Sequence, residues 1–191
     1  MFFAACAFAV ICLVPVSHSA SVVCEDLVQP LDRPDLLQLE GRWALVAGSL
    51  KHALAAETLK GTDSVVIDLN NSSYTQGSHV GGQCKYHGRN ISFESHTLTL
   101  KVKNFNFTVT FFHTSCPDCM LLMFDVVSPD YKSVDLYLLS KRRALDQLEM
   151  DEFKAQVSCL NMPSPVVMDP TKDLCPEQPA APPDKKEEVK A

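Results

Sequence analysis

The chain has 191 residues, with 23 acidic against 17 basic side chains and a formal net charge of -6. A mildly acidic chain with scattered charges argues against nucleic acid or an anionic membrane as its main partner. Without its apolar first segment the chain keeps roughly 170 residues, which is the size of one domain with its own core.

The first segment differs from the rest, because residues 2–16 are apolar and no charged side chain precedes Glu25. A run of about 15 residues is too short to span a bilayer, and small residues follow it, as at a signal-peptidase site. We therefore expect a signal peptide at 1–20, one barrel domain at 21–175 and a disordered Pro-rich, charged tail at 176–191. The segment has no Lys or Arg, which leaves a membrane anchor as the minor alternative.

Six cysteines remain after the leader, and an even number behind a signal peptide predicts disulfides in an oxidising compartment. Their spacing alone leaves the connectivity open. They are Cys24, Cys84, Cys116, Cys119, Cys159 and Cys175. Glycans are expected at exposed Asn-x-Ser/Thr acceptors, which occur at Asn70, Asn71, Asn90 and Asn106.

After an approach broken by Pro30 and Pro34, short runs of β-branched and aromatic residues alternate with turn-forming residues. We expect strands at 43–50, 64–70, 73–79, 83–93, 98–103, 105–114, 119–127 and 133–140. Eight strands without helices between them predict an all-β antiparallel barrel or sandwich. From Arg143 to Leu160 the apolar residues recur at helical spacing, which predicts one amphipathic helix packed outside the barrel.

A glycan on Asn106 would fix the inward side chains of its strand, because side chains alternate along a strand. The inner residues would then be Phe105, Phe107, Val109 and Phe111. By the same alternation Leu98, Leu100 and Val102 face inward in the preceding strand, and Val65, Ile67 and Leu69 do so earlier, with Ser64 and Asp68 outward. With Asp125 outward, the inner residues of the next strand are Met120, Leu122, Phe124 and Val126, and Leu121 and Met123 lie under the helix.

The last strand is ambiguous. Burial favours Val134, Leu136 and Leu138 in the lumen, and the alternative set is Asp135, Tyr137 and Leu139. The strand pattern also leaves open whether the barrel is filled by its own side chains or encloses one small ligand.

The triplet Gly41-Arg42-Trp43 opens the first expected strand. With the Pro-broken approach before it and eight strands and one late helix after it, the chain resembles the lipocalin family, whose signature is Gly-x-Trp. The family's middle motif is poorly kept, because Cys116 to Cys119 occupies its place. Within the family the chain resembles α1-acid glycoproteins and the fish tributyltin-binding and saxitoxin- and tetrodotoxin-binding proteins, with apolipoprotein M more distant. That closer resemblance rests on residues 24–28, 41–43, 83–86, 124–126, 152–160 and 173–175.

The resemblance implies an eight-stranded up-and-down barrel whose base is closed by Trp43, with Arg142 or Arg143 packed on its ring. It implies the bridges Cys24–Cys159 and Cys84–Cys175, which leave Cys116 and Cys119 for each other. It also places Asp135 and Tyr137 in the cavity, as the alternative phase of the last strand does. The expected ligand-binding set is therefore Leu98, Leu100, Phe105, Phe107, Val109, Phe111, Leu122, Phe124, Asp135 and Tyr137.

The expected function is that of a secreted, monomeric extracellular carrier in plasma or another body fluid, without cofactor, metal or stable membrane insertion. Its ligand would be a small hydrophobic or amphipathic molecule, with cationic compounds, toxins and other xenobiotics among the candidates that the resemblance implies. The alternative is a glycoprotein interaction or immunomodulatory module in which the barrel is mainly structural.

Cys116-Pro117-Asp118-Cys119 also admits a redox or a metal-binding interpretation, because Cys-x-x-Cys at a helix N-terminus has a lowered thiol pKa. Here a strand precedes the motif and another follows it, so a hairpin with a structural disulfide is favoured. No nucleophile elbow, phosphate loop or zinc-protease motif is present in the sequence, so we do not expect an enzyme.

Overall fold

The computed structural model describes residues 23–32, 34–70, 73–94, 97–102, 105–129 and 131–178, with the backbone alone at 36–37, 92–94, 97–102, 105–106 and 131. The helices are α1 (Cys24–Leu27), α2 (Leu36–Leu39), α3 (Ala53–Lys60) and α4 (Gln147–Cys159). The strands are β1 (Gly41–Leu50), β2 (Ser64–Leu69), β3 (Ser73–Val80), β4 (Gln83–Asn90), β5 (Ser92–Glu94), β6 (Thr97–Val102), β7 (Phe105–Phe112), β8 (Cys119–Ser128), β9 (Tyr131–Ser140) and β10 (Val166–Val167). Within these ranges no helix combines the length and apolarity that a membrane crossing requires.

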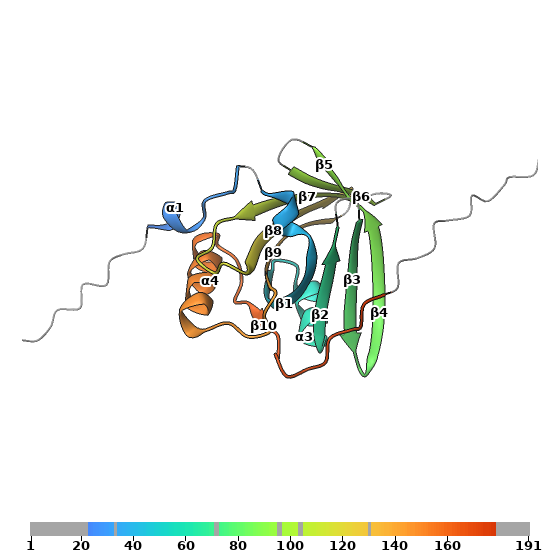
Figure 1. The fold of residues 1–191 in the computed structure, drawn as a ribbon. Coiled ribbons are helices and arrows are strands. Elements are labelled where there is room, and N and C mark those ends of the chain that lie inside the picture. Colours follow the sequence, from blue (N-terminus) through green and yellow to red (C-terminus); the bar gives the residue numbers. More distant parts are fainter. Residues whose placement is uncertain are drawn as a thin grey trace, which may run out of the picture.

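The strands form one antiparallel sheet that curves into a half-barrel, with the order β4-β3-β2-β1-β9-β8-β7-β6-β5 (Figure 1). In that order only the β1–β9 pair joins strands that are distant in sequence, and every other pair of neighbours consists of consecutive strands. The expected strand 83–93 is divided at the buried Ile91. Its first part pairs with β3 and its second part with β6.

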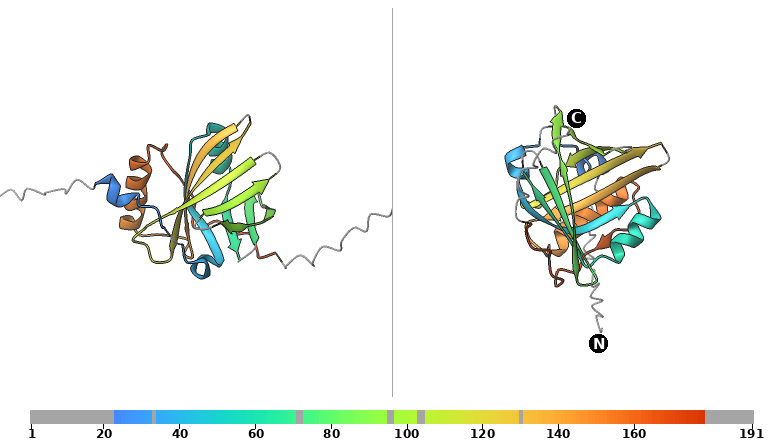
Figure 2. Two further views of the ribbon diagram at one scale, coloured as in Figure 1. Left: turned by 90° about the horizontal axis from the view of Figure 1, so that it is seen from above. Right: turned by 90° about the vertical axis from the view of Figure 1, so that its right-hand side faces the viewer.

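Helix α4 packs on the outer face of the sheet, as the apolar periodicity predicts (Figure 2). Phe153 and Val157 lie in one buried cluster with Leu121, Leu136 and Leu138. The helix starts at Gln147 rather than at Arg143, because Asp146 and Glu149 form a capping box in which each side chain accepts the other's backbone N–H at 2.9 Å.

A bulge in β1 changes which of its residues face inward. Leu45 pairs with Leu139, but Ala47 pairs with Leu138, so one extra residue lies between them. Trp43 and Leu45 belong to the inner cluster before the bulge and Leu50 after it. Strict alternation along the sequence would have placed Leu50 on the outer face.

The second half of β1 has β10 beside it where the first half has β2. From β10 the C-terminal strap, residues 168–178, runs over the outside of β2, β3 and β4. Asp173 O accepts a hydrogen bond from Ser64 Oγ at 2.6 Å, and Pro176 O accepts one from Tyr86 Oη at 2.8 Å. Ser64 thus faces outward as expected but is buried, because the strap covers it.

Three disulfides hold the chain, with the pairing that the resemblance implies: Cys24–Cys159, Cys84–Cys175 and Cys116–Cys119. The first ties α1 to the end of α4. The second fastens the strap to β4, and it lies over Gly77, where a β-carbon would come within 2.9 Å of Cys175 Cβ. The close approach of the strap therefore requires glycine at position 77.

Candidate functional site

The inner side of the sheet lines a cavity of about 690 Å³. One wall is apolar and comes from β1, β2, β7 and β8. Its residues are Leu45, Val65, Ile67, Phe107, Phe124 and Val126. Phe107, Phe124, Val65 and Ile67 therefore face inward as the strand alternation predicts. The Phe124 ring meets Tyr137 edge to face, with centroids 5.7 Å apart and an interplanar angle of 77°.

Asp135 and Tyr137 of β9 face the cavity, which resolves the ambiguous strand. The preference for Val134, Leu136 and Leu138 in the lumen, based on burial, is wrong. These side chains lie on the outer face and are packed beneath α4. Both faces of β9 are covered, so apolarity alone could not tell them apart.

Asp135 is 7% exposed, and its Oδ1 accepts a hydrogen bond from Ser133 Oγ at 2.7 Å. Burial raises the pKa of Asp135, because a carboxylate loses hydration when it is buried. Hydrogen bonds from Ser133 and Tyr137 and the nearby His52 counteract part of that increase. The cavity thus holds one buried acid whose charge is costly unless a cation compensates it.

The opposite wall is polar and was not expected from the sequence. It consists of Tyr74, Gln76, Ser78, His87 and Arg89 on β3 and β4, and we call it the polar wall. Tyr74 and Arg89 are directly paired across the two strands, as are Gln76 and His87. Tyr74 Oη donates to Gln76 Oε1, and Gln76 Nε2 donates to Ser78 Oγ at 3.0 Å. Burial raises the pKa of Tyr74 against the opposing charge of Arg89, so the hydroxyl stays protonated.

The inward residues of β3 follow the usual alternation of a strand, since Tyr74, Gln76 and Ser78 are every second residue. Because both faces of that strand carry polar residues, the sequence does not show which set points inward.

Helix α3 lines the cavity beyond the end of β1, through Ala55, Thr58 and Leu59, with His52 before the helix and Thr62 after it. Sequence reasoning missed this helix, although Ala53–Lys60 consists largely of strong helix formers. Gly48 of β1 allows its close approach, because a β-carbon there would lie 2.8 Å from Leu59 Cδ2 and 3.1 Å from Tyr137 Cδ1.

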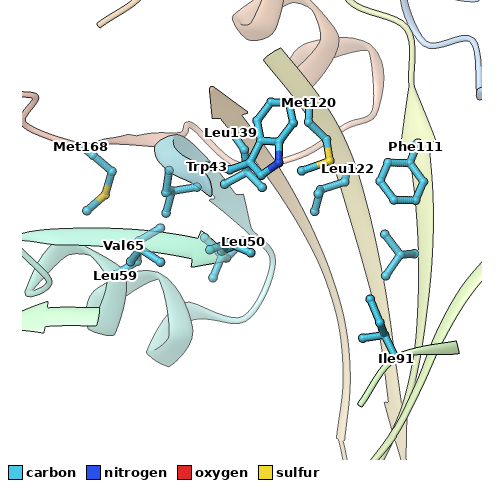
Figure 3. Close-up of a cluster of buried hydrophobic side chains, with 13 residues drawn as sticks. Trp43, Leu50, Leu59, Val65, Ile91, Phe111, Met120, Leu122, Leu139 and Met168 are labelled. Atoms are coloured by element: carbon cyan, nitrogen blue, oxygen red, sulfur yellow. The ribbon is translucent and has the colours of Figure 1, made fainter. Parts of the chain in front are cut away.

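Several expected ligand-binding residues do not line the cavity. Val109, Phe111 and Leu122 are buried in the inner core cluster around Trp43, where side chains fill the space (Figure 3). Leu98, Leu100 and Phe105 fall on strands whose side chains lie outside the described residues.

The basic residue over Trp43 is Lys141, with Nζ 4.9 Å from the ring centroid, and not Arg142 or Arg143. Arg142 is held elsewhere, because its guanidinium binds Asp118 at 2.6 Å and Glu149 at 2.6 Å. Arg143 donates to Asp169 O at 3.2 Å. Lys141, Arg142 and Arg143 are consecutive, so the sequence alone does not show which of them packs on the Trp43 ring.

Two of the expected glycan acceptors, Asn70 and Asn90, are exposed. Asn71 and the side chain of Asn106 lie outside the described residues. Among the described side chains, one group of three has metal-ligating atoms within 4.8 Å of one another: Cys116, Asp118 and Cys119. Its two sulfur atoms form a disulfide.

No protein-family model and no curated protein matches the sequence. A solved structure of the siderocalin Ex-FABP is similar to this chain, with a TM-score of 0.55 and 14% sequence identity. The similarity covers 75% of this chain and 97% of that one. That protein is described as functioning through dual ligand specificities. At this identity the likeness shows the fold alone, and the fold is the lipocalin type that the Gly-x-Trp context indicates.

Proposed function

We propose that this protein is a secreted carrier that binds one small apolar or amphipathic molecule in the cavity. The observation that carries the proposal is the cavity itself, about 690 Å³ in volume, with an apolar wall facing a few polar groups. That size and that lining are typical of ligand sites in proteins.

The apolar wall would supply most of the binding free energy. Burying ~200 Å² of apolar ligand surface is worth about 5 kcal/mol, before the cost of immobilising the ligand. Phe107 and Phe124 offer large contact areas with few rotatable bonds.

The buried acid supports a cationic group on the ligand. A cation beside Asp135 would restore the charge balance that burial disturbs, so the raised pKa of this carboxyl would fall on binding. This fits a place in the α1-acid glycoprotein group, whose members bind basic drugs and whose fish relatives bind organotins and cationic toxins. We extend that subgroup assignment and its ligand class to this chain as part of the proposal.

Enclosure of the ligand requires a closed wall. The sheet order starts with β4 and finishes with β5, and these two strands are joined by Ile91 alone. We therefore propose that the segment 83–94 closes the barrel around the cavity. Secretion is supported by the apolar leader and by the three disulfides. A binding role rather than catalysis is supported by the six cysteines of the described chain, which are all paired.

Titration with a neutral apolar fluorophore tests the proposal. Saturable binding of one molecule per chain is expected. Val126→Trp should abolish it, because Val126 lines the cavity, whereas Val127→Trp on the same strand should not, because Val127 is 43% exposed. Equal binding by both variants, or no saturable binding by the wild type, would contradict the proposal. Native mass spectrometry of protein from its own source fluid would then identify the ligand.

A further inference from the structure

The Cys116–Cys119 bond differs from the other two disulfides in the length of chain that it closes. Its cysteines are 3 residues apart, against 135 and 91 for the others. In the chain-entropy model the stabilisation that a disulfide gives grows with the logarithm of loop length. This bond therefore stabilises the fold least of the three, and the least free energy is lost when it opens.

We propose that Cys116–Cys119 is a thiol–disulfide exchange site, which small-molecule thiols open and small-molecule disulfides close again while the other two bonds stay intact. The site lies in the connection between β7 and β8, beside the first turns of α4 (Figure 1). It is separate from the cavity, so the inference does not depend on the proposed carrier function.

The turn is held in place without the disulfide. Asp118 O accepts hydrogen bonds from Lys141 N at 3.0 Å and from Ser140 Oγ at 3.1 Å. Ser115 N donates to the Glu152 carboxylate of α4 at 3.0 Å. Once reduced, the two thiols therefore remain close to each other, and reoxidation needs no search through conformations.

The two sulfur atoms have different surroundings, which fixes the direction of attack. Cys116 is 3% exposed, whereas Cys119, at the start of β8, is partly exposed. Arg142 Nη2 lies 3.2 Å from Cys116 Sγ. A guanidinium stabilises a thiolate, and a stabilised thiolate is the better leaving group. An incoming thiolate should thus attack Cys119 and release Cys116.

The exchange balances as follows. A thiolate forms a bond to Cys119 Sγ, the Sγ–Sγ bond breaks, and its electron pair leaves with Cys116 beside Arg142. A second thiolate attacks the sulfur of the small molecule on Cys119 and releases the Cys119 thiolate. Protons from solvent complete both thiols, so two thiols are oxidised to one small disulfide while the protein disulfide is reduced to a dithiol.

Asp118 stabilises the reduced state. Its Oδ1 lies 3.3 Å from Cys116 Sγ, and the hydrogen bonds from Arg142 hold the pKa of this carboxyl below its usual value. The carboxylate therefore stays ionised and can accept a hydrogen bond from the protonated Cys116 thiol. Arg142 favours the departing thiolate, and Asp118 favours the thiol that it becomes.

Graded reduction with dithiothreitol tests the proposal, with alkylation of free thiols and peptide mass mapping at each step. Cys116 and Cys119 should be alkylated at a lower dithiothreitol concentration than the other four cysteines, although Cys24 is the more exposed, because Arg142 makes Cys116 the better leaving group. Oxidised dithiothreitol should close the bond again. Opening of Cys24–Cys159 or Cys84–Cys175 at the same or a lower concentration would overturn the proposal.

Variants test the role of Arg142. Arg142→Gln should slow the opening by about tenfold, because the thiolate loses its cation. Arg143→Gln is the matched control and should leave the rate unchanged, since Arg143 contacts Asp169 instead. Equal opening rates in the two variants would reject the proposed direction of attack. If Arg142→Gln fails to fold, the order of reduction in the wild-type protein still decides the proposal.

Discussion

The two walls of the cavity are built on the same alternation of side chains but are chemically opposite. The apolar wall on β7 and β8 presents Phe107, Phe124 and Val126, and the polar wall on β3 and β4 presents a chain of hydrogen-bonding groups that ends beside Arg89. A ligand bound between them would have one apolar and one polar side. In the proposed carrier, affinity would come from the apolar wall, and selectivity from the polar wall and Asp135.

The largest effect is expected on the apolar wall. Phe124→Ala removes a ring that contacts both the cavity and Tyr137, and large-to-small changes of this kind cost about 3–5 kcal/mol of stability in a closed core. Because one side of the ring faces a cavity, we expect the lower end of that range. Affinity for a neutral apolar fluorophore should fall at least tenfold, measured by fluorescence titration of protein shown to be folded. Unchanged affinity would place the ligand elsewhere.

A charge-selective effect is expected at Asp135. Asp135→Asn removes the negative charge that would pair with the ligand's cation. It should therefore weaken the binding of cationic amphiphiles about tenfold, which corresponds to roughly 1.4 kcal/mol, and leave the binding of neutral ligands of the same shape unchanged. Equal weakening of both classes, measured by calorimetric titration, would remove the Asp135 charge from recognition.

The pH dependence of the same group follows from its raised pKa. Cation binding should fall as the pH drops through that raised value, because the carboxyl becomes neutral. The stability of the fold depends on pH in the opposite direction. The folded chain holds this proton more tightly than the unfolded chain, so stability is full below the unfolded pKa and declines as pH rises through the folded pKa. Asp135→Asn should therefore raise the Tm at neutral pH, and thermal scans at acidic and neutral pH would show it.

The smallest effect is expected on the polar wall. Arg89 is exposed, so its charge is screened by solvent. Arg89→Gln should weaken anionic amphiphiles only a few-fold, and less at high salt, while neutral ligands bind as before. Lys85→Gln on the same strand is the control, since Lys85 does not line the cavity. A uniform loss across ligand classes would mean that Arg89 acts on the fold rather than on charge.

The strands and the outer helix followed from the sequence where one face of an element is polar. Alternation predicts the inward residues of β7 and β8 once Asn106 and Asp125 are placed on the outer faces. Alternation failed for β9, because α4 buries the face opposite the cavity. A strand that is covered on both sides is apolar on both faces, so its sequence does not show which residues point inward. The bulge in β1 depends on β9, which lies far along the chain. The division of β4 from β5 arises because β4 pairs with β3 and β5 pairs with β6.

The helix α3 was missed for a different reason. Eight residues are too few for a helix to be stable alone, so its formation depends on Leu59 packing above Gly48. The polar wall was missed because hydrophobicity was the only guide to the inside, and here the inner side chains of β3 are not hydrophobic. Sequence reasoning therefore found the scaffold and half of the cavity.

The positions of the cysteines have a consequence for biosynthesis. Both long-range bonds join a cysteine to a partner in the last part of the chain. Cys24 can therefore form its bond only after Cys159 has been synthesised, and Cys84 only after Cys175. In a chain secreted as proposed, which emerges residue by residue into an oxidising compartment, these two thiols have no native partner until synthesis is nearly complete. Cys116 and Cys119 emerge almost together and before either late partner. The order of synthesis thus leaves the structural staples until last, and a chain cut short before Cys159 would have neither of them.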